Sequence, residues 1–234
     1  MPHITEIPLQ FTVEDVTHAW GSRREKLASP AMREKLSNLL QQIDANHWVN
    51  AAISYQIHRI TETGDGWLRA GDIKVTSSFV ANRLQHATHL ICGVCTLGDR
   101  FVDQVRYWFD RKQQLEAVLL DEIGTLLLYK LSEYFEDLMC QQAIDMGLEA
   151  SSMLNPGDDD FDIRQQDNIL NLAEGQKIGV HISGAVTLVP HKSLTTVIGL
   201  GKDMPTWDRA ETCSRCRSRE RCPHRQDLKA GVAA

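Results

Sequence analysis

The sequence predicts an α+β fold that is rich in helix and carries a small antiparallel sheet. The first observation is a long segment without proline, Leu115–Met146, whose centre is apolar on almost every side, as in a buried helix. The second is a series of three short strand-like runs, separated by Ser183-Gly184 and by residues 190–192. We expect these runs to form an antiparallel meander, with strands at Ile178–Ile182, Ala185–Val189 and Leu194–Leu200.

The size and composition are those of one large globular domain with an appendage. The chain has 234 residues, of which 42% are hydrophobic and 24% are charged. Residues after Asp203 are polar and include three cysteines. We therefore predict a folded domain over residues 1–202 and a cysteine-rich tail over residues 203–234.

The N-terminal third alternates between strand and helix patterns. Ile4–Val13 alternates weakly and predicts a short strand or an extended arm. Pro30–Ala45 has apolar residues at three- and four-residue steps, which predicts a helix. In Val49–Ile60, alternate residues from Ile53 to Arg59 lie as on one face of a strand and β-branched residues are frequent, and a glycine-containing turn separates this segment from Trp67–Val75. These two segments predict a pair of strands.

The middle of the chain continues this alternation. Ser77 and Ser78 can cap a helix that carries Val80 and Leu84. Gly147 is expected at the C-terminal end of the long helix. The remaining predicted elements are a strand at His89–Thr96, a helix at Asp99–Arg111, a turn at Asn155–Asp160 and a helix at Ile163–Leu172.

The net charge and the hydropathy pattern bear on the class of protein and its location. The net charge is −6 and the pI is about 5.8, whereas proteins that bind nucleic acid usually carry an excess of basic residues. The N-terminal residues lack the pattern of a signal peptide, and no apolar run is long enough for a membrane helix. We expect a cytoplasmic protein, so its six cysteines should be reduced thiols or metal ligands.

The most specific chemical signal is a group of three cysteines, Cys213, Cys216 and Cys222, which we call the tail cysteines. The Cys-x-x-Cys spacing can bring two thiolates to one metal, and Cys222 follows closely enough to complete the site. The proline after Cys222 favours an iron–sulfur cluster. Zinc is the alternative, with His224 as its fourth ligand, and a tail without metal is the third possibility.

The other cysteines and the acidic turn have plainer interpretations. Cys92 and Cys95 lie in an apolar run and are expected in the core, with Cys95 the better candidate for a fourth ligand. Cys140 is expected to be buried on the long helix. The three aspartates of residues 158–160 match no calcium loop, so we expect a solvated turn.

Several motifs together resemble the activation domain family of cobalamin (vitamin B12)-dependent methionine synthase. Cys95–Arg100 and Leu115–Gly124 resemble the segments that lead into the family's long helix. Asn155-Pro156-Gly157, with two glutamines shortly after, resembles its Pro-Gly-Tyr loop. Ile178–Leu200, with Pro190-His-Lys-Ser193 inside it, resembles its strand pair with a central Pro-x-Lys-Ser turn. The resemblance covers residues 30–202.

This resemblance implies a C-shaped α+β fold with a twisted antiparallel sheet. It also implies a role in returning inactive cob(II)alamin to methylcobalamin, with an electron and S-adenosylmethionine. In the family the loop binds S-adenosylmethionine, so Asn155, Pro156 and Gly157 are the candidate cofactor-binding residues. Met153 and Asp158 stand where the family has arginine and tyrosine, and we therefore expect S-adenosylmethionine to bind weakly or not at all.

Our functional hypothesis follows from the tail and the resemblance together. The chain would be an accessory protein for a corrinoid-dependent methyltransferase that assists reductive reactivation, with an iron–sulfur cluster as electron donor. The alternatives are an S-adenosylmethionine-dependent reactivase and a non-catalytic binding module with structural zinc. Whether the chain is itself an enzyme stays open. The expected partner is a corrinoid protein, and its corrinoid would meet polar donors near the meander: Ser183, Thr187, His191 and Ser193.

Overall fold

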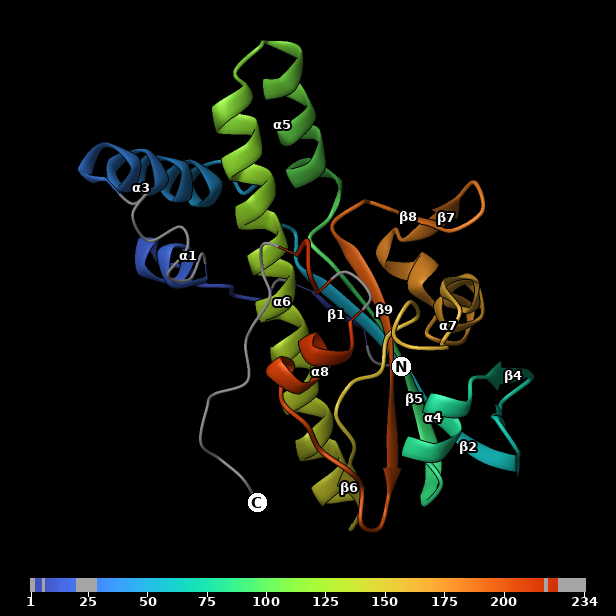
Figure 1. The fold of residues 1–234 in the computed structure, drawn as a ribbon. Coiled ribbons are helices and arrows are strands. Elements are labelled where there is room, and N and C mark those ends of the chain that lie inside the picture. The colour runs from blue at the N-terminus through green and yellow to red at the C-terminus, as the bar shows by residue number, and fades with distance from the viewer. Residues whose placement is uncertain (1–2, 6, 20–28, 217–218, 223–234) are drawn as a thin grey trace. The chain divides into compact units, whose positions relative to one another are not determined.

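The computed structural model describes residues 3–5, 7–19, 29–216 and 219–222 (Figure 1). It has the predicted α+β class, with helices and an antiparallel sheet. The chain divides into two compact units that interleave in sequence. Unit 1 comprises residues 1–54, 94–135 and 175–194, and unit 2 comprises residues 55–93, 136–174 and 195–234.

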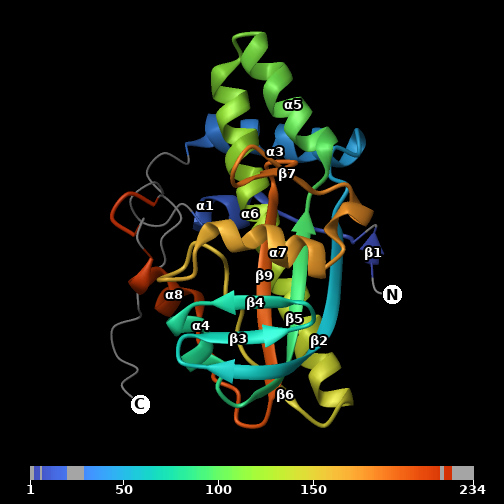
Figure 2. The ribbon, with the colours of Figure 1, turned by 90° about the vertical axis from the view of Figure 1, so that its right-hand side faces the viewer.

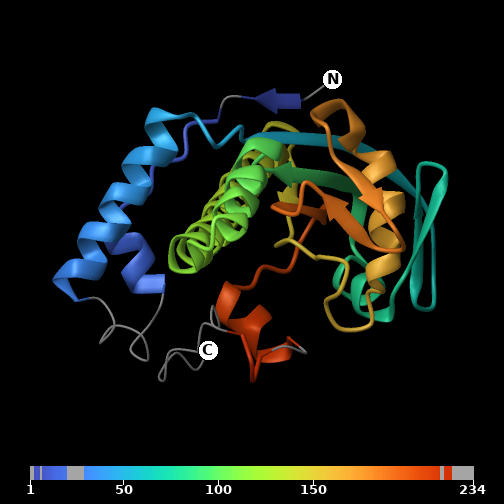
Figure 3. The same cartoon turned by 90° about the horizontal axis from the view of Figure 1, so that it is seen from above.

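Unit 1 is mostly helical. Ser29 accepts a hydrogen bond from the Met32 amide and begins α3 (Pro30–Ala45), which buries Leu36, Leu39 and Ile43. The short helix α1 (Val13–Ala19) lies beside α3 (Figure 3). The unit also contains α5 (Asp99–Asp110), the first two thirds of α6 (Gln114–Asp145) and the short strands β1 (His3–Thr5), β7 (His181–Ser183) and β8 (Thr187–Val189).

A glycine in α6 allows close packing inside unit 1. A Cβ atom added to Gly124 would lie 2.3 Å from Cε1 of Phe101, which is fully buried. Lys192 crosses the same surface of α6, and its ammonium lies 2.8 Å from Asp121 Oδ1 and donates to Thr125 Oγ1 at 2.9 Å. The Lys192 side chain is only 13% exposed, so this pairing satisfies a charge that would otherwise be costly to bury.

Unit 2 contains most of the sheet. The elements that lie wholly within it include β3 (Trp67–Ala70), β4 (Ile73–Thr76), α4 (Ser78–Arg83) and β6 (Glu149–Ala150). It also contains a 3-10 turn (Ile163–Gln165), α7 (Gln166–Leu172) and α8 (Arg209–Arg215). Three long strands, β2 (Ala52–Gly64), β5 (Ala87–Thr96) and β9 (Ser193–Gly201), begin or end in unit 1.

The sheet has seven strands and is larger than the small sheet that we expected. Its order is β4-β3-β2-β5-β9-β6, and β1 pairs with β2 (Figure 2). The pairs β2–β3, β3–β4 and β6–β9 are antiparallel. Within the described ranges, no helix combines the length and the apolar character needed to cross a membrane.

The predicted N-terminal strand or arm is confirmed in part by β1, whereas the helix α1 that follows, where Thr12 and Asp15 exchange the hydrogen bonds of a helix cap, was not predicted. Two predictions about the elements are wrong in detail. The predicted strand Trp67–Val75 is a hairpin, because Gly71 turns the chain with φ +58°. The predicted meander does not form. β7 pairs only with β8 in a separate ribbon, and β9 lies in the main sheet between β5 and β6.

Candidate functional site

The Asn155–Asp160 turn, which we call the proline–glycine loop, is closed by its own hydrogen bonds. The backbone amide and the side-chain amide of Asn155 donate to Asp158 Oδ2 at 3.1 and 3.3 Å. The Gly157 amide donates to the Phe161 carbonyl at 2.7 Å, and Gly157 has a φ of +104°, which L-residues rarely adopt. The loop therefore has a fixed conformation that depends on asparagine and glycine at these positions.

Asp160 fastens the end of this loop to the start of α4. Its carboxylate accepts hydrogen bonds from the Ser77 hydroxyl and from the Ser78 and Phe79 amides. Burial opposes ionisation, but these hydrogen bonds outweigh it and hold the pKa of Asp160 below its usual value. We expected a solvated acidic turn, whereas Asp158 and Asp160 both make structural hydrogen bonds.

The segment that precedes α8 lies beside the proline–glycine loop. Ser152 and Trp207 are joined by two hydrogen bonds, in which the Ser152 hydroxyl donates to the Trp207 carbonyl and accepts from the Trp207 amide. Asp158 and Trp207 line one small pocket together with Met153 and Cys216. The segment before α8 is therefore anchored beside the proline–glycine loop.

Two arginines hold α8 in this position. The guanidinium of Arg83 donates to Glu211 Oε1 at 3.2 Å, and that of Arg215 donates to the same oxygen at 3.1 Å. Arg83 lies 4.5 Å from the centre of the Trp207 ring, and Arg215 lies 5.1 Å from that of Phe79. We call these five residues the arginine–aromatic cluster. They are brought together from α4 and from the segment around α8, which are far apart in the sequence.

The pocket between the loop and α8 is almost filled. Its free volume is about 10 Å³, which is about the space that one water molecule needs. Burial raises the pKa of Asp158, while the bonds from Asn155 and the charge of Arg215 act in the opposite direction. Met153 lines the same pocket, and its backbone amide donates to Glu136 Oε1 at 3.1 Å. As it stands, the loop has no space for a cofactor.

The tail cysteines lie at and beyond the end of α8. Cys213 is in its last turn and Cys216 is its C-cap, and all three tail cysteines are partly exposed and lie outside any disulfide. No three side chains of histidine, cysteine, aspartate or glutamate converge on one point in the described ranges. His224 lies outside those ranges.

The remaining cysteines differ from one another. Cys92 and Cys95 are fully buried in β5, as expected for core residues, and burial raises the pKa of both thiols. Cys140 is exposed, so the prediction that it is buried was wrong.

The polar residues that we expected to face a corrinoid lie in unit 1, on and after the β7–β8 ribbon. Ser183, Thr187 and His191 are exposed. Ser193 is half-buried and donates its hydroxyl proton to Thr96 Oγ1 at 2.8 Å. Three of the four donors are therefore accessible to a ligand.

Comparisons with known proteins identify the fold. No family model matches the sequence, and no curated protein matches it. Among solved structures, the chain is similar to the MetH reactivation domain, whose crystal structure was determined with bound AdoHcy. The TM-score is 0.64, and the match covers 88% of this chain and 81% of the other at 10% sequence identity. The expected activation-domain fold is thereby supported, and the likeness extends to the fold alone.

Proposed function

We propose that this protein is an accessory factor for a corrinoid-dependent methyltransferase and assists the reductive reactivation of cob(II)alamin. The fold supports this proposal, because it is shared with a domain that is named for reactivation. The observation that carries the proposal further is the position of Cys216. This tail cysteine lines the same pocket as Met153 and Asp158 of the loop region. Redox-active or metal-binding thiols would therefore lie beside the loop that the family resemblance assigns to the cofactor.

The tail cysteines supply the donor set for an iron–sulfur cluster, with structural zinc as the alternative. Thiolates suit both, and the partial exposure of the tail cysteines leaves them accessible. They do not converge among the described residues, so a metal would require the segment after α8 to fold around it.

S-adenosylmethionine has a secondary place in the proposal. The solved neighbour contains AdoHcy, and the proline–glycine loop here keeps its asparagine, proline and glycine. However, Asp158 stands where the family resemblance has a tyrosine, so its carboxylate would repel a methionyl carboxylate bound there, and the pocket beside it is small. Binding would therefore have to displace α8 from the loop, at the cost of the hydrogen bonds and ring contacts of the arginine–aromatic cluster.

The test is a titration of the purified, oxygen-protected protein with a methyltransferase subunit loaded with corrinoid. The same subunit without corrinoid is the matched control, and free hydroxocobalamin is the second ligand. We expect a complex with the loaded subunit at about 50 µM or below and a changed corrinoid spectrum. If the loaded and empty subunits bind equally, or if neither binds and free hydroxocobalamin is unchanged, the corrinoid role is wrong. Metal analysis of the same preparation separates iron–sulfur from zinc.

A further inference from the structure

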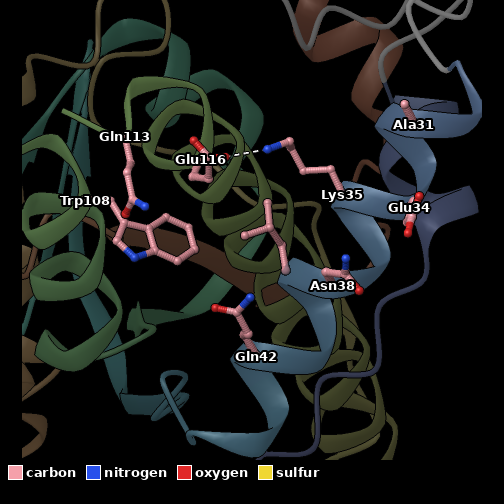
Figure 4. A pocket seen from close by; sticks show the side chains of 9 residues that line it. Ala31, Glu34, Lys35, Asn38, Gln42, Trp108, Gln113 and Glu116 are labelled. Carbon is pink, nitrogen blue, oxygen red and sulfur yellow. Dashed lines mark hydrogen bonds and ion pairs between the residues drawn. The ribbon is translucent and has the colours of Figure 1, made fainter. Parts of the chain in front are cut away.

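Unit 1 contains a groove that the proposed function does not use. It has a volume of about 440 Å³, which is within the range of small-molecule sites. One wall is a stripe of α3 with residues at helical spacing, and the other wall comes from the end of α5 and the start of α6 (Figure 4). Its floor includes Leu39 and Trp108, which are 2% and 7% exposed.

Charges of both signs meet at one side of this groove. The ammonium of Lys35 forms an ion pair with the Glu116 carboxylate across the groove (Figure 4). The side chains are 36% and 29% exposed, and the hydrogen bond from Lys35 lowers the pKa of Glu116. Ion pairs that are this accessible contribute at most about 1 kcal/mol, so a ligand can open this one at small cost.

Three carboxamides complete the lining. Asn38 and Gln42 project from α3, and Gln113 projects from the turn before α6. Within the described ranges, none of these three side chains forms a hydrogen bond with the protein. Each carboxamide offers both donors and an acceptor to a bound molecule. The groove thus combines an apolar floor, side-chain carboxamides that are available for hydrogen bonds, and one pair of opposite charges.

We propose that this groove binds a zwitterionic amino acid with an apolar side chain. The ligand carboxylate replaces Glu116 as the partner of Lys35, and the ligand ammonium binds Glu116, with Glu34 nearby in the same lining. A ligand with only one charge would leave either Lys35 or Glu116 without its partner. The apolar side chain lies on the indole of Trp108, where an aromatic ring can stack or pack edge-on.

The experiment compares three ligands that share a phenyl ring and differ in which charged groups they carry. L-Phenylalanine carries both charges, phenethylamine carries only the ammonium, and 3-phenylpropionate carries only the carboxylate. Calorimetry on the full chain at neutral pH should give a Kd of about 1 mM or below for phenylalanine. Both single-charge ligands should bind at least about 10-fold more weakly, because each leaves one side chain unpaired.

Two variants and a matched control locate the site. Lys35→Gln and Glu116→Gln should each weaken phenylalanine binding by about 10-fold. Arg33→Gln removes a charge from the same helix, but Arg33 pairs with Glu14 and does not line the groove. It should leave the affinity unchanged. The proposal is wrong if phenylalanine fails to bind at about 10 mM. It is also wrong if the three ligands bind equally, or if all three variants behave alike.

Discussion

Asp160 offers the sharpest test of how the proline–glycine loop is held in place. In Asp160→Ala, the amides of Ser78 and Phe79 lose their acceptor at the start of α4, and the Ser77 hydroxyl loses a partner. The hydrogen bonds to the two amides are 2.9 and 3.1 Å long, which is normal geometry for N–H···O. The variant therefore removes the hydrogen bonds between the loop and α4 and keeps those that close the loop itself.

The expected loss of stability follows from these contacts. Removal of a side chain that caps a helix costs about 1 kcal/mol, with up to about 2 kcal/mol in favourable cases. The negative charge near a helix N-terminus contributes about 0.3–1 kcal/mol more. Asp160 is exposed, so solvent screening reduces the charge contribution. We expect a loss of about 1–2 kcal/mol, or about 2–8 °C in Tm for a chain of this size.

Urea unfolding and thermal melts at neutral pH measure this loss. Asp160→Asn keeps one oxygen acceptor and should lose about half as much. The matched control is Asp65→Ala, which removes a carboxylate from the exposed turn between β2 and β3 and should change Tm little.

The pH dependence gives a second check with a definite sign. The pKa of Asp160 is lower in the folded protein than its ordinary value of 3.8, so its contribution to stability is complete well above that pH. It is lost as the pH falls through the lower, folded value. The stability gap between wild type and Asp160→Ala should therefore shrink between about pH 5 and pH 3. A gap below about 0.3 kcal/mol at neutral pH, or one that does not change with pH, would refute the reasoning.

Three further predictions concern other parts of the chain. Replacing any one of the tail cysteines with serine should abolish bound metal in a metal analysis, whereas Cys92→Ser should keep the metal and lower stability, since Cys92 is fully buried. Gly124→Val should lower the free energy of unfolding in urea by about 1–3 kcal/mol because of the clash with Phe101, and a fully stable variant would contradict the packing described. The double change Met153→Arg and Asp158→Tyr should tighten S-adenosylmethionine binding measured by calorimetry, provided that the loop keeps its conformation without the hydrogen bonds from Asn155 to Asp158, and low-micromolar binding by the unmodified chain would contradict our account of the loop.

The elements that could be predicted from the sequence are those that form because of residues close together in the chain. The hydroxyls of Ser29 and Ser77 accept hydrogen bonds from backbone amides in the first turns of α3 and α4, as expected of serine at a helix start. The long helix α6 begins and ends within one residue of the predicted bounds, because its continuous apolar pattern has no competing interpretation. The division of Trp67–Val75 at Gly71 was missed, since its alternation continues on both sides of the turn.

Long-range pairings could not be predicted in the same way. The runs that became β7, β8 and β9 have similar local composition, yet only β9 enters the main sheet. Nothing within a strand specifies which distant strand it joins. The same applies to the site. The loop was visible as Asn155-Pro156-Gly157, whereas Arg83 and Glu211 are 128 positions apart and meet only in the fold.

The interleaving of the two units has a consequence for how such a chain could have arisen. Each unit is assembled from three separate stretches of sequence, and β2, β5, β9 and α6 each pass from one unit to the other. End-to-end joining of two genes yields units that are contiguous in sequence. End-to-end joining by itself therefore does not produce the arrangement seen here, and a crossover within residues 55–194 would exchange portions of both units at once.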